Sequence, residues 1–597
     1  MVKIGGASGF WGDSMTGVLQ LVKEPGIQFI TFDYLAELTM SLLATARSKN
    51  PELGYCPDFV ELAMKFTLPM IKEKGIRIVS NAGGINPHGC AKALQALLDL
   101  MKIDLKIAVV AGDDLTGRQE EFRAQGATDM TSGAAMPAKL VSANAYLGAF
   151  PVAAALDAGA DIVITGRTVD SALPLGILIH AFGWKANDFD KLAMGSLAGH
   201  LIECGAQATG GLFTDWKDVP GWANIGYPVL ECEADGRFAV TKPKGTGGLV
   251  SVPVLSEQML YEIGDPGNYV LPDVVCDFTQ VRITQVGLAD DHRVAVEGAK
   301  GKPPTPHYKV CATYVDGYRC VANLSIVGED AVAKARRTGE TIFERTRGLL
   351  KMLGMPDYTR TQIDVLGEEP DFGPNARVHH DLRETVVRLA ACHPVKQALE
   401  LFARELAPAG TSYAPGTTGS LSSGRPSVSP RVRLFSFLVP RDSVQVELTV
   451  ADQTIGYEAP AVETQTANKS PSLAASAAIG AGTLTGAMRE VKLIDIAHGR
   501  SGDKADTSNI GIIARKPELV DALRSVLTET AVRKHLGHYV KGSIRIYEVP
   551  GIGAFNIVAE QALDGGGLSS LRADPLGKAM AQILLTMPVS VPANLLQ

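Results

Sequence analysis

The chain begins MVKIGGASGFWGDSMTGVLQL (residues 1–21), a short apolar run followed by a glycine-rich segment. Residues 2–4 predict a strand, and the glycines after it let the backbone turn sharply before a helix that begins near residue 13 or 14. Such a loop presents backbone N–H groups and the positive end of a helix dipole to an anion. The stretch predicts the first strand of an α/β sheet whose loop either binds a phosphate or carboxylate or is only a tight turn. The candidate ligand-binding residues in it are Gly6, Ser8, Gly9 and Asp13.

The glycine spacing also raises the possibility of a dinucleotide site. Gly6, Gly9 and Gly12 form G-x-x-G-x-x-G, a variant of the usual fingerprint, and the next apolar run ends at Asp33, where an acidic residue would meet a ribose. Reductases with such a loop usually carry a catalytic Tyr with Lys four residues later, and none of the fourteen tyrosines has that partner. A nicotinamide-dependent reductase is therefore an alternative, and not the first choice.

Four further apolar runs follow the first, with helical segments between them. This alternation is typical of a parallel sheet flanked by helices, in which ligands bind at the carboxyl ends of the strands. We therefore predict an α/β fold with a mostly parallel sheet over residues 1–280, and a single rim where the loops meet. The predicted strands are VKIGG, IQFITF, GIRIVSNAGG, LKIAVVAGDD and ADIVITGR.

The rest of the chain falls into three parts that differ in composition and in their predicted strands and helices. Residues 281–465 have longer strands and a helix near 330–353, which predicts a second, α+β lobe of a core that spans 1–465. The Gly/Ser/Pro-rich segment 410–431 in this lobe is either a functional lid or plain disorder. Residues 466–490 have the Ser/Ala/Gly composition of a linker. Residues 491–597 alternate strands and helices, which predicts a small C-terminal α/β sandwich domain.

Composition excludes several classes of protein. A net charge of −7 without a basic stripe argues against a nucleic-acid partner. The apolar runs are too short to cross a bilayer, so we expect no membrane association and a cytoplasmic location. The eight cysteines form no C-x-x-C pair, so neither a zinc ribbon nor a disulfide framework is supported.

Several long motifs resemble one known family. GGASGFWGD, SNAGGINPHG, DIVITGRTVDSALPLG, HLIECGAQATGG, TKPKGTGG and YEIGDPGNYVLPDV resemble the acyclic terpene utilisation (AtuA) family, long catalogued as a domain of unknown function. AHGRSGDKADTSNIGI and GGGLSSLRADPLGKA are similar to the small domain that commonly follows it, with Ala505 where glycine is expected. The resemblance covers nearly the whole chain and implies catabolism of branched acids through coenzyme A thioesters.

Four residues are candidates for proton transfer. His88 follows a strand and an amide-rich loop and is suited to move a proton near neutral pH, although it could simply begin a helix. Asp170 could act as a base or orient Arg167, whose planar fork suits a carboxylate or phosphate, or the two could form only a structural pair at a helix N-terminus. His200 and Glu203 lie three residues apart on one helix face and favour acid–base or hydrogen-bonding roles over metal binding, although this face could also be merely solvated. We predict no metal site.

Other polar and glycine residues at the strand ends are predicted to bind ligand. The loop AHGRSGDK is dense in titratable groups, which favours a site or an interface over a solvated bend. The cations and glycines of TKPKGTGG suit phosphates, or form a plain turn. The additional candidate ligand-binding residues are Asp33, Asn81, Gly83, Gly84, Asn86, Asp113, Lys242, Gly247, His498, Arg500, Asp503 and Lys504.

These observations predict a catabolic enzyme that acts on a branched acyl-CoA thioester as a hydratase, dehydratase or lyase. Such chemistry needs a carbonyl held by N–H donors and a positioned acid–base group, and no cofactor beyond the coenzyme A of the substrate. A non-catalytic binding or assembly partner of a carboxylase or hydratase is the rival from another class. We also expect a homo-oligomer, and we expect Gly9→Val to abolish ligand binding with little loss of fold.

Overall fold

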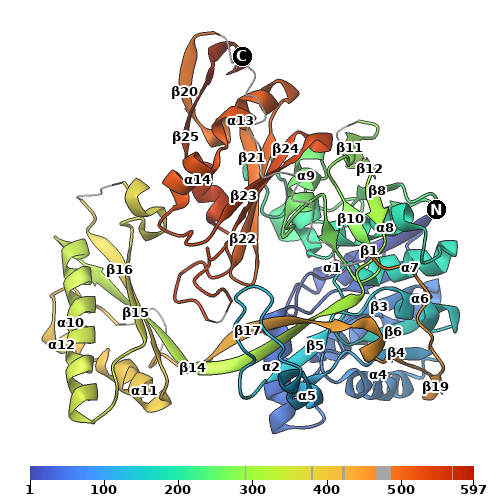
Figure 1. Ribbon diagram of the computed structural model, residues 1–597, viewed down its shortest axis with the longest axis horizontal. Coiled ribbons are helices and arrows are strands. Elements are labelled where there is room, and N and C mark those ends of the chain that lie inside the picture. The colour runs from blue at the N-terminus through green and yellow to red at the C-terminus, as the bar shows by residue number, and fades with distance from the viewer. Residues whose placement is uncertain (289–290, 378–380, 420–423, 466–485, 568, 597) are drawn as a thin grey trace.

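The computed structural model describes residues 1–288, 291–377, 381–419, 424–465, 486–567 and 569–596. Figure 1 shows three parts: a large α/β lobe, an arm reached by a long two-stranded ribbon, and a C-terminal domain between them. The predicted linker 466–490 lies mostly outside the described residues; of it, 486–490 is described and already includes the start of strand β20 (Met488–Lys492).

The five predicted strands of the α/β lobe are confirmed, and they are parallel. They lie side by side in the order β1-β2-β3-β6-β4. Four of the five are fully buried or nearly so, as expected of β-branched strands covered on both faces. Their bounds are β1 (Val2–Gly6), β2 (Phe29–Phe32), β3 (Arg77–Ser80), β4 (Ile107–Ala111) and β6 (Ile162–Thr165).

Helices cover both faces of this parallel core, and each face has its own apolar cluster. One cluster joins the sheet to α1 to α4 and to the π-helical turn η1, and the other joins it to α6, α7 and α8. This three-layer arrangement leaves the carboxyl ends of the strands free to carry a site. The helices of the lobe are α1 (Thr16–Leu21), α2 (Glu37–Lys49), η1 (Phe59–Met64), α3 (Lys65–Lys74), α4 (Pro87–Met101), α5 (Gln119–Ala124), α6 (Phe150–Asp157), α7 (Ala172–Phe182), α8 (Phe189–Ile202) and α9 (Val252–Leu260).

The complete sheet is mixed, which corrects the prediction of a mostly parallel one. Antiparallel strands extend it at both edges to eleven strands, in the order β11-β12-β8-β7-β1-β2-β3-β6-β4-β18-β19. The predicted boundary at 281 is therefore wrong as a division between lobes, because strands on its far side pair with the first sheet. The added strands are β7 (Val229–Cys232), β8 (Phe238–Thr241), β11 (Arg282–Gln285), β12 (Val294–Glu297), β18 (Glu447–Val450) and β19 (Gln453–Ile455). A separate small sheet contains β9 (Tyr269–Val270), β10 (Val275–Asp277) and β13 (Lys300–Lys302).

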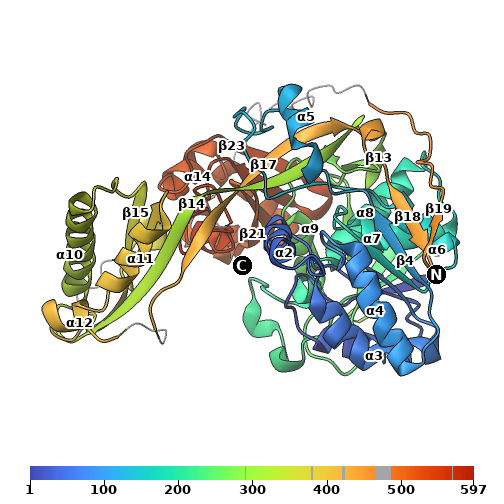
Figure 2. The same ribbon diagram turned by 90° about the horizontal axis from the view of Figure 1, so that it is seen from below.

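The arm is built on β14 (His307–Val327), a strand of 21 residues that pairs with β17 (Val428–Pro440) along most of its length. One end of β14 pairs with β5 (Ser142–Ala145) of the α/β lobe, and the other end pairs with β16 (Glu384–His393). The ribbon therefore runs from the lobe into the arm, as Figure 2 shows from below. The arm also contains β15 (Arg360–Leu366), α10 (Ala331–Met352), α11 (Lys396–Glu405) and α12 (Ala409–Ser412), and α10 confirms the helix predicted near 330–353.

The C-terminal domain is an antiparallel sheet in the order β21-β22-β24-β23, packed on short helices. The predicted charged loop AHGRSGDK is in fact strand β21, paired along its whole length with β22. Ala505, in the turn after it, has φ +57°, so the site where glycine was expected does need the left-handed conformation. The elements are β21 (Ala497–Lys504), β22 (Thr507–Ala514), β23 (Ile544–Val549), β24 (Ala554–Ala559), α13 (Val520–Val526), α14 (Glu529–Leu536) and α15 (Met580–Leu584), with β20 paired to β25 (Pro588–Pro592).

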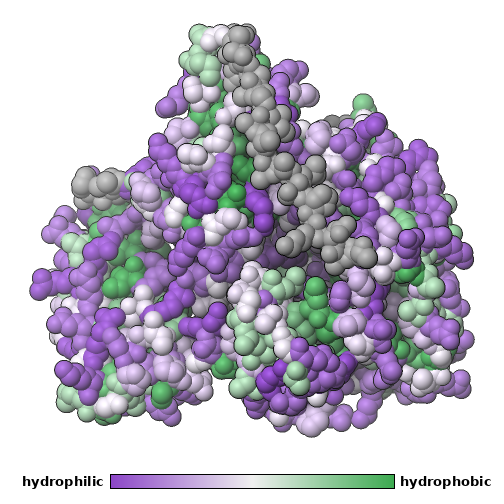
Figure 3. All heavy atoms as spheres, viewed as in Figure 1, coloured by the Kyte–Doolittle hydropathy of each residue, from purple (hydrophilic) through white to green (hydrophobic). Residues whose placement is uncertain are grey.

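Within the described residues, no helix is both long enough and apolar enough to cross a membrane. The face of the molecule seen in Figure 3 is mostly hydrophilic, and its apolar patches are scattered.

Candidate functional site

A cavity of about 640 Å³ lies where the α/β lobe, the arm ribbon and the C-terminal domain meet. The lobe contributes the loops after β1, β2 and β6 and the start of α2. The ribbon contributes β17, and the C-terminal domain contributes the β21–β22 turn, a glycine loop at 565–567 and Lys578. The polar residues of the lining are Asp13, Asp33, Glu37, Thr39, Ser41, Arg167, Asp170, Glu203, Gln207, Tyr227, Tyr261, Glu262, Asp503, Lys504 and Lys578.

Three carboxylates meet in the lining of this cavity. Asp33, Asp170 and Glu203 each place an oxygen within 4.8 Å of the others. Asp33 follows β2 and Asp170 follows β6, so the parallel sheet brings these two to one rim as predicted. Glu203 comes from a different direction, at the end of α8.

Burial and mutual repulsion favour a proton on this carboxylate cluster. Burial raises the pKa of Asp33 well above its ordinary value, and the charges of Asp170 and Glu203 raise it further. Burial also raises the pKa of Glu203, although the neighbouring His200 opposes this. The cluster can therefore contain a carboxylic acid beside a carboxylate at neutral pH. The same three oxygens are also of the type that binds a divalent cation.

His200 supports the cluster from behind. Its Nδ1 lies 3.0 Å from Glu203 Oε1, and its Nε2 lies 3.1 Å from the carbonyl oxygen of Gln258. Burial disfavours the imidazolium, but the charge of Glu203 and the hydrogen bond to it outweigh burial and raise the pKa of His200. The predicted pair on one helix face therefore exists. His200 is buried and orients Glu203, whereas Glu203 itself lines the cavity.

Arg167 lies in the cavity wall, but protein groups hold its guanidinium. Nη1 donates to Asp170 at 2.7 Å and to the carbonyl oxygen of Leu35 at 3.0 Å, and Nη2 donates to the hydroxyl of Tyr146 at 3.2 Å. The guanidinium also lies 4.3 Å from the centre of the Tyr146 ring. The geometry favours an arginine that positions Asp170 over the predicted role of Arg167 as a clamp for a substrate carboxylate or phosphate.

The opening glycine loop lines the cavity without forming an open anion cradle. The N–H of Gly9 donates to Asp13 Oδ2 at 2.8 Å, and Asp13 Oδ1 accepts from the hydroxyl of Tyr227. A Cβ at Gly9 would lie 2.6 Å from the carbonyl carbon of Cys204, and one at Gly6 would lie 2.7 Å from a backbone oxygen of α8. These glycines therefore let the end of α8 approach the loop closely. This close approach positions Glu203 in the lining of the cavity. Because Val at Gly9 would overlap backbone, the expectation that Gly9→Val spares the fold is withdrawn.

Ser8 and the loop after β3 hold Asp33 in place. The hydroxyl of Ser8 donates to the carbonyl oxygen of Asp33 at 3.2 Å. Asn81 Nδ2 donates to Asp33 Oδ1 at 2.6 Å, while Asn81 Oδ1 accepts from a backbone N–H. Gly83 and Gly84 are needed for close packing, since a Cβ on either would meet a backbone oxygen within 3 Å.

The remaining part of that loop begins a helix. Asn86 caps α4, accepting from the N–H of Gly89 at 3.0 Å. His88, predicted as a catalytic residue, is exposed in the first turn of α4 and is outside the cavity lining.

We expect His88→Ala to leave both the melting temperature and any turnover by this protein essentially unchanged, because His88 contacts neither the cavity nor the core. Thermal denaturation and steady-state kinetics check this expectation. A loss of turnover greater than about tenfold in a folded variant would show that His88 takes part in the reaction.

Asp113 lies behind the site and does not line it. Its Oδ2 accepts from Asn144 Nδ2 and from the N–H of Arg167, both at 2.8 Å. Burial raises the pKa of Asp113 to about 7, although both hydrogen bonds oppose this. The residue holds the Arg167 backbone instead of contacting ligand.

Asp113 makes a testable contribution to pH-dependent stability. Its carboxyl has an ordinary pKa of about 3.9 in the unfolded chain, so its stabilising effect is complete below that pH and is lost as pH rises through about 7. Because the amide in Asp113→Asn cannot ionise, the melting temperature of this variant should fall less than that of the wild type between about pH 5 and pH 8. Thermal denaturation at both pH values measures this, with the exposed Asp99→Asn as control; equal losses in wild type and Asp113→Asn would contradict the assignment.

Four further predicted ligand residues lie outside the cavity. Lys242 Nζ donates to the carbonyl oxygen of Thr246 at 2.8 Å, and a Cβ at Gly247 would overlap Gly221, so this segment is a packed turn. His498 and Arg500 point from β21 into the interface with the α/β lobe. His498 Nε2 lies 2.9 Å from Asp215.

Arg500 is buried at the same interface and has several partners. It forms an ion pair with Glu257 at 3.0 Å, and its Nη1 and Nη2 donate to Gln207, Gln258 and the carbonyl oxygen of Gly211. It therefore connects the domains.

The other two candidates of β21, Asp503 and Lys504, do line the cavity. Burial raises the pKa of Asp503 to about 7. Lys504 Nζ lies 3.3 Å from Glu262, and Lys578 Nζ lies 3.1 Å from Glu262 and 3.4 Å from Asp503. Two ammonium groups of the C-terminal domain therefore line the cavity beside Glu262 of the lobe.

Sequence reasoning missed Lys578, Tyr261, Glu262 and Glu37 as site residues. The first three lie in motifs that carry the family resemblance, which is the one signal that could have found them. Glu37 accepts from the hydroxyl of Tyr146 at 2.8 Å. Burial raises the pKa of Glu37, but the charges of Lys309 and Arg167 outweigh burial and lower this pKa to about 2.

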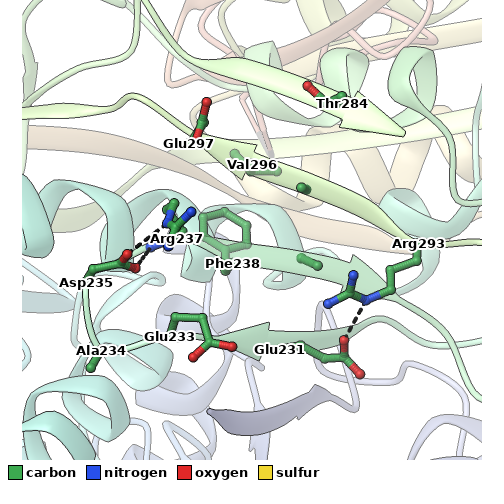
Figure 4. A pocket seen from close by; sticks show the side chains of 12 residues that line it. Glu231, Glu233, Ala234, Asp235, Arg237, Phe238, Thr284, Arg293, Val296 and Glu297 are labelled. Atoms are coloured by element: carbon green, nitrogen blue, oxygen red, sulfur yellow. Dashed lines mark hydrogen bonds and ion pairs between the residues drawn. The ribbon is translucent and has the colours of Figure 1, made fainter. Parts of the chain in front are cut away.

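Another concave region is more open than the candidate site, and its arginines pair with neighbouring carboxylates. It lies on the antiparallel strands β7, β8, β12 and β11, and Figure 4 shows its charged side chains. Arg293 Nε pairs with Glu231 and Arg237 Nε pairs with Asp235, each at 2.8 Å. Both arginines are thus neutralised by adjacent carboxylates, so this surface is not our candidate site.

Comparison with known proteins agrees with the motifs. Residues 2–450 match the model of the acyclic terpene utilisation family protein AtuA, and residues 491–590 match that of the AtuA ferredoxin-like domain. Neither the curated proteins nor the solved structures give a match. Because the first match spans most of the chain and the second covers its C-terminal domain, the chain belongs to the acyclic terpene utilisation (AtuA) family.

Proposed function

We propose that this protein is a catabolic enzyme that acts on a branched acyl-CoA thioester, by adding or removing water or by cleaving a carbon–carbon bond beside the thioester carbonyl. The observation that carries the proposal is the meeting of Asp33, Asp170 and Glu203 within 4.8 Å of one another in the lining of this cavity. Perturbed carboxyl groups that share a cleft are typical of acid–base sites.

The cavity wall supports a branched apolar substrate. Besides the charged residues, the lining includes four apolar side chains of α2 and β17, namely Leu38, Leu42, Val432 and Leu434. A ligand with a branched hydrocarbon tail and a polar carbonyl end would match a lining that contains both apolar and charged side chains. Membership of a terpene utilisation family is consistent with such a tail.

The residues have complementary roles in the proposed reaction. Asp170, held by Arg167, acts as the base: it removes a proton from water in hydration, from the 3-hydroxyl in carbon–carbon cleavage, and from the carbon next to the thioester carbonyl in dehydration. The carboxyl of Asp33 acts as the acid: it supplies a proton to that carbon in hydration and cleavage, and to the leaving hydroxyl in dehydration. Lys504, which lines the same cavity, stabilises the negative charge that develops on the carbonyl oxygen. No redox cofactor is needed for this class of reaction.

The test is incubation of the full chain with a panel of branched enoyl-CoA and 3-hydroxyacyl-CoA compounds, followed by mass analysis of the products. Parallel samples treated with EDTA, or supplied with Mg²⁺ or Mn²⁺, distinguish a shared proton from a bound cation at the three carboxylates. We expect conversion of at least one compound. Binding without conversion of any compound would favour the alternative of a non-catalytic binding or assembly partner, and absence of both would reject the proposal.

The nicotinamide-dependent alternative has less geometric support. Strand β1 has a parallel neighbour on one side and the antiparallel β7 on the other. The dinucleotide crevice of doubly wound folds forms where the order of parallel strands reverses, and β1 does not lie at such a point here. The N–H of Gly9 is also bonded to Asp13.

A further inference from the structure

A second cavity, of about 500 Å³, adjoins the candidate site. The two cavities share Gly211 and Lys578 in their linings. The second cavity lies between the segment after η3 (Gly205–Thr209) of the lobe and β21 and α15 of the C-terminal domain. An extended ligand could therefore occupy both cavities.

Two exposed tryptophans stand at this second cavity. Trp216, in η4 (Trp216–Asp218), is 54% exposed, and Trp222, in η5 (Trp222–Asn224), is 58% exposed. Their ring centres are 5.8 Å apart, with an angle of 65° between the planes. By contrast, Trp184 is buried. Exposed aromatic rings gathered at one cavity are suited to stack on a planar ring of a ligand.

Leu212 adds a second unusual feature to the same cavity. Its backbone has φ +59°, a conformation that residues other than glycine seldom adopt, and this apolar residue is 66% exposed. Both features are energetically unfavourable. The neighbouring carbonyl oxygen of Gly211 is held by Arg500 Nη2 at 2.9 Å. Backbone held in a sparsely populated conformation occurs preferentially at ligand sites.

The charges near the shared residues and near Trp216 differ. Where the cavity adjoins the candidate site, Lys578 is already paired with Glu262 and Asp503. Lys217 does not line the cavity, but it is exposed beside it, with its ammonium 5.6 Å from the centre of the Trp216 ring. An uncharged linker therefore suits the shared residues, and a phosphate suits the surface beside Trp216.

We propose that the second cavity binds the adenine nucleotide end of the coenzyme A carrier, with the adenine stacked on Trp216 or Trp222 and a phosphate near Lys217. The pantetheine arm passes Gly211 and Lys578, and the acyl group reaches the carboxylate cluster. This inference rests on the proposed function, because it assigns the remainder of the same substrate.

The test compares binding of coenzyme A, ADP and pantetheine by calorimetry, in the wild type and in the double variant Trp216→Ala, Trp222→Ala. We expect the variant to bind coenzyme A and ADP at least about tenfold more weakly, as for loss of base–aromatic stacking. Pantetheine binding should not change. Phe66→Ala is the matched control, because Phe66 is 57% exposed on α3 and lines neither cavity.

The outcomes separate this inference from the proposed function. Unchanged affinity of the variant for coenzyme A and ADP would overturn the nucleotide site, even if acyl-CoA compounds are converted with unchanged KM. Tryptophan-dependent binding of ADP without conversion of any thioester would uphold the site and reject the proposed chemistry. A change in oligomeric mass with unchanged coenzyme A affinity would instead identify the tryptophans as a contact between copies of the chain, and would overturn the inference.

Discussion

Asp33→Asn should reduce kcat on the thioester that this protein converts by about 10²–10⁴-fold, the usual contribution of a positioned acid or base. Asn is nearly the same shape as Asp, so the hydrogen bonds with Asn81 and Leu35 can be largely preserved. The variant loses the proton that burial and the neighbouring carboxylates retain on Asp33. KM should change much less than kcat, because the expected loss is in proton transfer.

The pH profile provides a second measure of the role of Asp33. Since the pKa of Asp33 is raised, wild-type kcat should fall as rising pH removes its proton, and Asp33→Asn should lack that decline. Asp99→Asn, on the exposed face of α4, is the control for the loss of one surface carboxylate. A folded Asp33→Asn variant with kcat near the wild-type value would exclude Asp33 as the acid.

Arg500→Met should lower the free energy of unfolding by about 3–5 kcal/mol, the typical cost of breaking a buried ion pair from one side. Arg500 is 4% exposed, and its partner Glu257 is fully buried in α9. Met retains much of the apolar length of arginine but leaves the Glu257 carboxylate unpaired, and it removes the donors to Gln207 and Gln258. The C-terminal domain should therefore separate from the lobe at lower denaturant concentration.

Denaturant unfolding measures this effect, and two further variants test its cause. The double variant Arg500→Met, Glu257→Gln should recover much of the loss, because the uncompensated buried charge is gone. Arg237→Met removes an exposed ion pair with Asp235 and should cost at most about 1 kcal/mol. An Arg500→Met variant as stable as Arg237→Met would show that the interface does not depend on this ion pair.

The local sequence pattern predicted the parallel core well. Each of the five strands is a short β-branched run that ends in glycine or polar residues, and the helices lie between them. Because parallel strands end at a common rim, the same pattern also predicted that Asp33 and Asp170 would meet. These features depend on neighbouring residues, which a sequence displays directly.

Pairing between distant segments was not predictable in the same way. Strands β11, β12, β18 and β19 join the first sheet although they follow residue 281, and β21 was mistaken for a loop because its charged residues pair with the lobe. A polar strand buried in an interface has the composition of an exposed loop. Its true environment depends on partners far away in the chain.

The sequence alone therefore determined the family, the parallel strands and the rim that carries Asp33, Asp170 and Arg167, since local patterns and long motifs encode them. Only the tertiary structure decided that Glu203 completes the carboxylate cluster, that Lys578 lines the same cavity and that His88 does not. The physical reason is that burial, ionisation and contact at this site arise where three parts of the chain pack together. Residue order does not specify the distances between them.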